Sequence, residues 1–277
     1  MSTIVNTNVS SIGAKNALAQ SQRSLEKSMQ QLSTGHRINS AADDAAGLAI
    51  SNKLSTQIGS LNQAVRNAND GISMLQTADG ASGQMVAMFQ RMRELAIQAG
   101  NDTNDQSGRD ALSLEFTELQ TEISNSISNT SWNGMQLLDL GSGSSTNVHF
   151  HVGPSSSDNI ALPLASLNSS DVQTALTTAS IDSLANATSS LTLIDNAITQ
   201  IDTERGKWGA MMNRLTFAAD NATNVSLNSS ASRSRILDTD YAQATAEMAK
   251  AMILDSAGSA MLTQANQQPM YVLALLS

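Results

Sequence analysis

The sequence of 277 residues contains no cysteine. The side chains best suited to chemistry are therefore its three histidines, His36, His149 and His151. His149 and His151 stand two positions apart in the alternating segment 148–152, so they would share one face of a strand and could hold a metal ion. Two imidazoles without a nearby cysteine or carboxylate make a weak site, and we favour a solvent-facing polar pair in a hairpin. The lack of cysteine excludes disulfides, iron–sulfur clusters and cysteine-ligated zinc.

No other group of residues points to catalysis. The adjacent carboxylates Asp43 and Asp44 lie in the segment 41–47 (AADDAAG), which is typical of a helix start, where acidic side chains meet the positive end of the helix dipole. The sequences HExxH and GxSxG and a Walker-type glycine loop do not occur. The sequence therefore predicts no enzyme, no cofactor and no metal site.

Apolar side chains recur at alternating steps of three and four residues over much of the chain, which predicts long helices. These helices must position the histidines and carboxylates named above. No proline lies between Met1 and Gly153 to interrupt the N-terminal helices. Turn-forming clusters at 100–104 and 132–134 are expected to break them. The seams with this spacing run over 54–75, 85–95, 112–123 and 184–222.

A short insert of different composition separates the helical parts. Alternation over 148–152 and a second apolar stretch over 160–164 predict a β-hairpin, with a turn at 154–158. Two strands are marginally stable alone, so the hairpin is expected to lie on the helices and is too small to be a catalytic domain. The predicted fold class is mainly α, a long antiparallel helical bundle or coiled coil with a small β-hairpin insert.

The two ends of the chain are apolar, poorly charged and able to form helices. Leucines recur at a strict seven-residue spacing near the N-terminus, and no charged residue follows Asp255 near the C-terminus. An isolated helix of this kind would expose an apolar stripe, so the ends are expected to pack against each other or against neighbouring subunits. The side chains predicted to drive such polymerisation are Leu18, Leu25, Leu32, Met248, Met252, Met261 and Leu275.

Charge separates the middle of the chain from its ends. The net charge is −9, and the segment 110–204 holds 11 of the 24 acidic residues with no lysine or arginine, which leaves a net charge of +2 elsewhere. This distribution predicts an acidic middle that faces water and near-neutral ends that pack, and a net negative chain is a poor nucleic-acid binder. No apolar run approaches the ~20 residues of a membrane span, and the N-terminus lacks the features of a Sec-type signal peptide.

Segments near both ends closely resemble the terminal signatures of bacterial flagellins. The resemblance covers about 1–135 and 190–277, in the same order along the chain. The matching segments are 31–35 (QLSTG), 43–50 (DDAAGLAI), 66–72 (RNANDGI), 232–236 (SRSRI), 264–267 (QANQ) and the finish 272–276 (VLALL).

The resemblance implies a minimal filament subunit without large outer domains. A terminal coiled coil from 1–44 and 235–277 would form the filament core, and 45–234 would form a rod-like helical bundle that includes the insert at about 140–183. The subunit would self-assemble into a helical polymer for swimming motility, outside the cell, after type III export without a cleaved signal peptide. Its implied partners are copies of itself, an export chaperone that masks 240–277, cap proteins and hook-junction proteins, with no membrane insertion.

The same resemblance extends to a contact motif for a vertebrate Toll-like receptor. A downstream arginine of that motif is replaced here by Leu119, which is expected to weaken binding. The monomer rather than the filament is expected to bind, because contacts between protofilaments would bury this face. The motif matches at Gln90, Arg91, Glu94, Leu95 and Glu115.

Two other functions stay open at this point. A hook–filament junction protein has similar architecture, although its ends do not usually carry the finish found at 264–276. A flagellin-like surface adhesin would use the acidic, Ser/Thr-rich middle, which has no aromatic platform for sugars.

Overall fold

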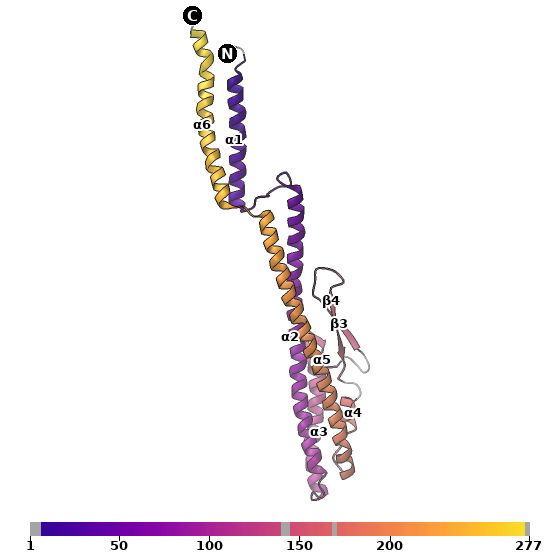
Figure 1. Ribbon diagram of the computed structural model, residues 1–277. Helices are drawn as coiled ribbons and strands as arrows, with labels where there is room; N and C mark the ends of the chain where they lie inside the picture. Colours follow the sequence, from indigo (N-terminus) through magenta and orange to yellow (C-terminus); the bar gives the residue numbers. More distant parts are fainter. Residues whose placement is uncertain (1–6, 140–144, 168–170, 275–277) are drawn as a thin grey trace. The chain divides into compact units, whose positions relative to one another are not determined.

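The computed structural model describes residues 7–139, 145–167 and 171–274, most of which are helical (Figure 1). The helices are α1 (Val9–Thr34), α2 (Ala45–Ala99), α3 (Gln106–Asn129), α4 (Asp171–Thr177), α5 (Leu184–Leu237) and α6 (Tyr241–Ala274). The strands are β1 (Ser131–Trp132), β2 (Met135–Gln136), β3 (Ser145–His151) and β4 (Asn159–Ala165). The predicted fold class is confirmed, and α2 ends where the turn-forming cluster 100–104 begins.

The chain divides into two compact units. The terminal unit comprises Met1–Ile58 and Leu227–Ser277, and the central unit comprises Gly59–Ser226. The units thus divide within α2 and α5, whereas the sequence placed the junctions at 44/45 and 234/235. The first turns of α2 and the last turns of α5 belong to the terminal unit, where the Arg233 guanidinium donates to the Ser55 hydroxyl at 3.3 Å.

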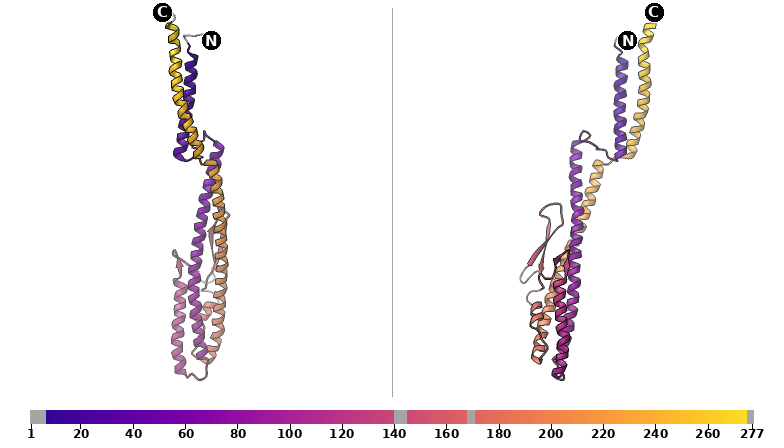
Figure 2. Two further views of the ribbon diagram at one scale, coloured as in Figure 1. Left: turned by 60° about the vertical axis from the view of Figure 1, so that its left-hand side comes forward. Right: turned by 180° about the vertical axis from the view of Figure 1, so that it is seen from behind.

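In the terminal unit, α1 and α6 lie side by side along their lengths (Figures 1 and 2). Gly35 ends α1 in the left-handed conformation, with φ at 73°, and its N–H donates to the Gln31 carbonyl. Beyond this cap, the Arg37 N–H donates to the Leu237 carbonyl at 2.7 Å, which joins the end of α1 to the end of α5. Asp44 accepts from the Gly47 N–H at 2.8 Å, so the carboxylates at 43–44 do stand at a helix start.

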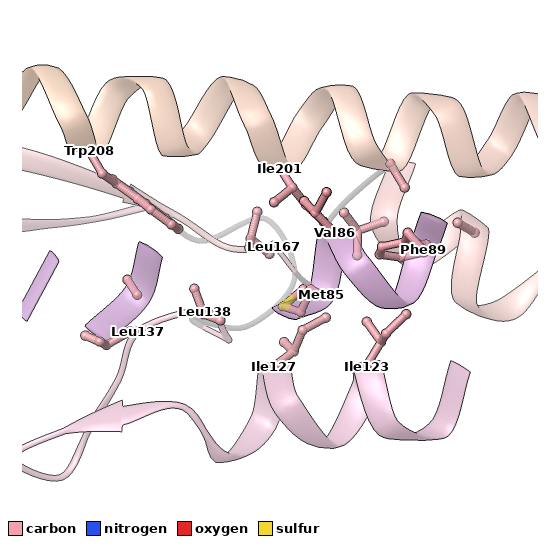
Figure 3. Packing of buried hydrophobic residues seen from close by; sticks show 14 of the residues in the cluster. Met85, Val86, Phe89, Ile123, Ile127, Leu137, Leu138, Leu167, Ile201 and Trp208 are labelled. Atoms are coloured by element: carbon pink, nitrogen blue, oxygen red, sulfur yellow. The ribbon is translucent and has the colours of Figure 1, made fainter. Parts of the chain in front are cut away.

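The central unit packs α2, α3 and α5 around a continuous apolar core. Figure 3 shows Met85 and Phe89 of α2 between Ile123 and Ile127 of α3 on one side and Ile201 of α5 on the other. The predicted seams contain Met85, Ile123 and Ile201, whereas Phe89 and Ile127 are buried at positions outside the predicted spacing. Leu184, a predicted seam residue at the start of α5, is exposed. The largest fully buried side chains are Trp208, Phe89, Phe116, Leu75, Met85, Met92, Leu95, Ile123, Leu137, Leu138, Leu162 and Leu164.

The predicted hairpin forms, and a second, shorter strand pair flanks the expected break at 132–134. β3 and β4 pair antiparallel as the predicted hairpin, with Val148 opposite Leu162. β1 and β2 pair across a two-residue turn in which Asn133 and Gly134 both have positive φ, which accounts for the predicted break at 132–134.

Candidate assembly surfaces

The helices α1 and α6 meet along a seam of small residues. Ser21 and Ser28 of α1 are buried, as are Ala244 and Ala251 of α6, and each pair is separated by seven residues. Four of the larger side chains predicted to drive polymerisation are half-buried at seam positions between these small residues. They are Leu18, Leu25, Leu32 and Met248.

Hydrogen bonds cross this seam and show that the helices are antiparallel. The Ser21 hydroxyl donates to the Ala251 carbonyl at 2.9 Å, and the Asn8 amide donates to the Ala265 carbonyl at 2.7 Å. At Gly258 an added Cβ would lie 3.3 Å from Cδ1 of Leu18, so the α6 backbone passes close to α1. A search for large apolar residues overlooks these serines and glycines, but their seven-residue spacing is a signal that could have revealed the seam.

Away from the seam, α1 and α6 carry large apolar side chains that the described residues leave exposed. Met261 of α6, for example, is 63% exposed. Of the residues predicted to drive polymerisation, Met252 and Met261 present accessible apolar surface, while Leu275 lies outside the described residues. This concentration of large exposed apolar side chains on one helix pair is typical of an interaction surface. The exposed side chains are Val9, Ile12 and Met29 on α1 and Met252, Ile253, Leu254 and Met261 on α6.

A groove of about 980 Å³ runs along the α1–α6 pair. Small residues of both helices line it, among them Ala17, Ala257 and Gly258, and Leu254 and Met261 add apolar surface. Charged side chains of both signs line the part where α1 ends and α6 begins. They are Lys27, Arg37, Asp43, Asp44, Glu247 and Lys250. The groove therefore combines an apolar packing surface with charges that can set the register of a partner.

Asp43 is the most strongly perturbed of these charged groups. The Lys27 ammonium lies 3.0 Å from its carboxylate, and the Ser40 N–H donates to the same side chain at 3.1 Å. These interactions, led by the bond from Lys27, lower the pKa of Asp43 from 3.8 to about 2. The pair ties α1 to the loop that precedes α2, so the carboxylate has a structural role.

Five residues resemble a receptor-contact motif. Gln90, Arg91, Glu94 and Glu115 are exposed, whereas Leu95 is buried in the core. Arg91 of α2 lies 2.8 Å from Glu115 of α3 and 3.0 Å from Glu94, and these two carboxylates raise the pKa of the guanidinium, Glu115 the more strongly. Gln90 is exposed beside them. Leu95 is only 1% exposed, because it packs in the central core, so the prediction of a surface contact is wrong for this side chain.

No metal centre or membrane span is found in the part of the chain that the structure describes. Among residues 7–139, 145–167 and 171–274, no three His, Asp or Glu side chains come together as metal ligands. None of the helices described combines the length and the hydropathy needed to cross a bilayer. His149 and His151 are exposed on one face of β3, with Nδ1 of His151 2.9 Å from Oδ1 of Asn159.

Two family models match the chain at its two ends. Residues 5–143 match the bacterial flagellin N-terminal helical region, and residues 191–276 match the bacterial flagellin C-terminal helical region. The two matched segments contain α1, α2 and α3 at one end and most of α5 and α6 at the other.

Curated relatives match over nearly the whole length. The flagellin of Halalkalibacterium halodurans is 42% identical over 273 residues, which cover 99% of both chains. The flagellin of Bacillus subtilis is 36% identical over 301 residues, with 98% of this chain and 99% of the relative covered. The crystal structure of Bacillus cereus flagellin is similar with a TM-score of 0.51 at 31% identity, over 57% of this chain and 88% of that one.

Proposed function

Because this chain belongs to the bacterial flagellin family and is a structural subunit of the flagellar filament, we propose that the exposed apolar faces of α1 and α6 join one copy to the next. The observation that carries the proposal is that α1 and α6 pair along one side within the chain, while large apolar side chains at other positions around both helices stay exposed. The resulting filament serves swimming motility.

Burial of these faces supplies the free energy of assembly. Each square ångström of apolar surface removed from water contributes about 25 cal/mol. Contacts between different faces of successive copies give an open helical polymer when the rotation from one copy to the next does not close a ring. Met252 and Met261 act directly at this interface. Leu18, Leu25, Leu32 and Met248 act indirectly by pairing α1 with α6, and we retain Leu275 as a further contact by its place in the apolar finish of the sequence.

Charge introduced at two exposed apolar positions of α6 tests this proposal. We expect the double variant Met252→Glu/Met261→Glu to form no filaments at concentrations where the unmodified chain does, with unchanged helix content by circular dichroism. The matched control is Ser156→Glu, which adds a carboxylate to the exposed turn of the central hairpin and should polymerise normally. Electron microscopy provides the readout, and normal filaments from the double variant would contradict the proposal.

We infer that the exposed apolar side chains of α6 are masked before assembly by an export chaperone, because a chain with exposed Met252, Ile253 and Leu254 would otherwise aggregate. Cap and hook-junction proteins are the further partners at the two ends of the filament. Export proceeds through the flagellar type III apparatus with no cleaved signal peptide. The intact mass of chains released from filaments tests this route, since a cleaved signal would remove roughly 15–30 N-terminal residues.

We infer, finally, that the exposed Gln90–Arg91–Glu94–Glu115 cluster is the surface that a vertebrate Toll-like receptor binds on the monomer. Leu95 supports this surface from the core. Arg91→Ala removes the central charge of the cluster and should lower receptor signalling by the monomer in a reporter-cell assay, with the fold unchanged because both ion pairs are exposed. Unchanged signalling by the variant would exclude this surface.

A further inference from the structure

The central hairpin presents two histidines on the face that points away from the helices. His149 and His151 are exposed, whereas Val148 and Phe150, which alternate with them along β3, are half-buried and pack against the core. Positions i and i+2 of a strand are about 7 Å apart and point to the same side. Two imidazoles at that spacing can converge on one ion with metal–nitrogen bonds of roughly 2 Å.

The strand that carries the histidines is fixed to α2. The ring of Phe150 lies against Gly71, where an added Cβ would come within 2.9 Å of a ring carbon, so only glycine allows this approach. The Asn67 amide donates to the His151 carbonyl at 2.9 Å. These two contacts hold the strand on both its inner face and its edge, so the imidazoles start from a defined backbone position.

A neighbouring asparagine orients one of the rings for metal binding. The Asn159 amide nitrogen donates to the Ser156 carbonyl at 3.2 Å, which turns its Oδ1 toward the ring of His151. That oxygen can only accept, so in this contact Nδ1 of His151, 2.9 Å away, is the donor, and the ring would bind a metal ion through Nε2. A metal-binding histidine in proteins has this arrangement, with the second ring nitrogen held by an acceptor.

We propose that His149 and His151 form a two-imidazole chelate for divalent transition cations, strongest for Cu²⁺ and weaker for Ni²⁺ and Zn²⁺. Imidazole suits all three ions, and Cu²⁺ gives the highest affinity of the divalent series at a nitrogen site. Water completes the coordination. The site is independent of the proposed assembly surfaces and would be repeated once per subunit along a filament.

A Cu²⁺ titration of the full chain, kept monomeric, tests the chelate. We expect one ion to bind, and His149→Ala or His151→Ala to weaken its binding at least tenfold. Asn159→Ala, which leaves both imidazoles in place, should weaken it about tenfold because the ring of His151 loses its fixed orientation. His36→Ala removes the third histidine of the chain and is the matched control, with unchanged affinity expected.

Electron paramagnetic resonance of the copper complex provides a second readout that does not depend on affinity. Two imidazole nitrogens are expected in the spectrum of the unmodified chain, and one in either single variant. Equal Cu²⁺ affinity in the unmodified chain and in the His149→Ala/His151→Ala double variant would overturn the proposal, as would a single-nitrogen spectrum of the unmodified chain. Circular dichroism of each variant shows that a loss of binding does not reflect a loss of fold.

Discussion

The terminal and central units use opposite packing strategies. In the terminal unit, α1 and α6 meet through buried serine and alanine together with half-buried leucines such as Leu18, while other large apolar side chains such as Met261 stay exposed. In the central unit, Trp208, Phe89 and other large side chains are fully buried between three helices. The ion pairs Arg93–Asp195 and Arg205–Asp79, each at 2.7 Å, add links between α2 and α5.

This contrast indicates which unit is stable alone. Burial of large apolar side chains supplies most of the free energy of folding, and the central unit completes that burial within one chain. The terminal pair only half-buries Leu18, Leu25, Leu32 and Met248 and leaves other large side chains exposed, so most of its stability must come from assembly. A subunit built in this way can stay monomeric before assembly and become rigid only in the filament.

The largest effect on stability is expected in the central core. Trp208→Ala removes a side chain with no exposed surface, and we expect it to lower the free energy of unfolding by about 3–5 kcal/mol. Phe217→Ala on the same helix is the matched control, because Phe217 is 74% exposed and its loss should change stability by less than about 0.5 kcal/mol. Urea unfolding followed by circular dichroism measures the free energy of unfolding of both variants. Equal losses in the two variants would contradict the contrast between core and surface.

A smaller effect, confined to the terminal unit, is expected from overpacking the seam. Ser21→Leu places a large side chain at a buried position and removes the bond to the Ala251 carbonyl, which should destabilise the α1–α6 pair by about 1–3 kcal/mol. Gln22→Leu, at the neighbouring exposed position, should leave the pair intact. Hydrogen exchange in α1 and α6 measures the change, and the urea midpoint of the central unit should stay the same in both variants.

The smallest effect concerns the Lys27–Asp43 pair. Because the folded state lowers the pKa of Asp43 from 3.8 to about 2, its contribution to stability is complete above pH 3.8 and is lost as the pH falls toward 2. Lys27→Met removes the largest cause of the shift and should bring the pKa of Asp43 closer to 3.8. NMR titration of the Asp43 carboxyl measures this value, and an identical titration in the variant would show that Lys27 does not hold the carboxylate.

Much of the fold could be predicted from the sequence because its signals are local. The three-and-four spacing placed many of the buried residues of α2, α3 and α5, and the alternation over 148–152 placed the hairpin of β3 and β4. The turn at Asn133–Gly134 was expected as a break, but the two-residue strands β1 and β2 beside it are too short to show an alternating pattern. The junctions between the units could not be placed in the same way. The helices α2 and α5 continue through them, so no turn or glycine cluster in the sequence marks either position.

The candidate surfaces were predicted less completely, since spacing identifies a helix face but not what covers it. Leu18 and Met261 have the same apolar character, yet Leu18 lies on the seam and Met261 is exposed. Leu95 follows Glu94 directly, but its side chain enters the core. Which face each residue occupies depends on the pairing of α1 with α6 and of α2 with α3 and α5, segments far apart in the sequence.

Hydrogen–deuterium exchange, compared between monomer and filament, tests the central claim most directly. In the monomer, we expect amides of α1 and α6 to exchange far faster than those of α2 and α5 around Met85 and Trp208. In the filament, α1 and α6 should become protected while the central unit changes little. Equal protection of α1, α6 and the central unit in the monomer would contradict the account, because the terminal unit would then be stable without its neighbours.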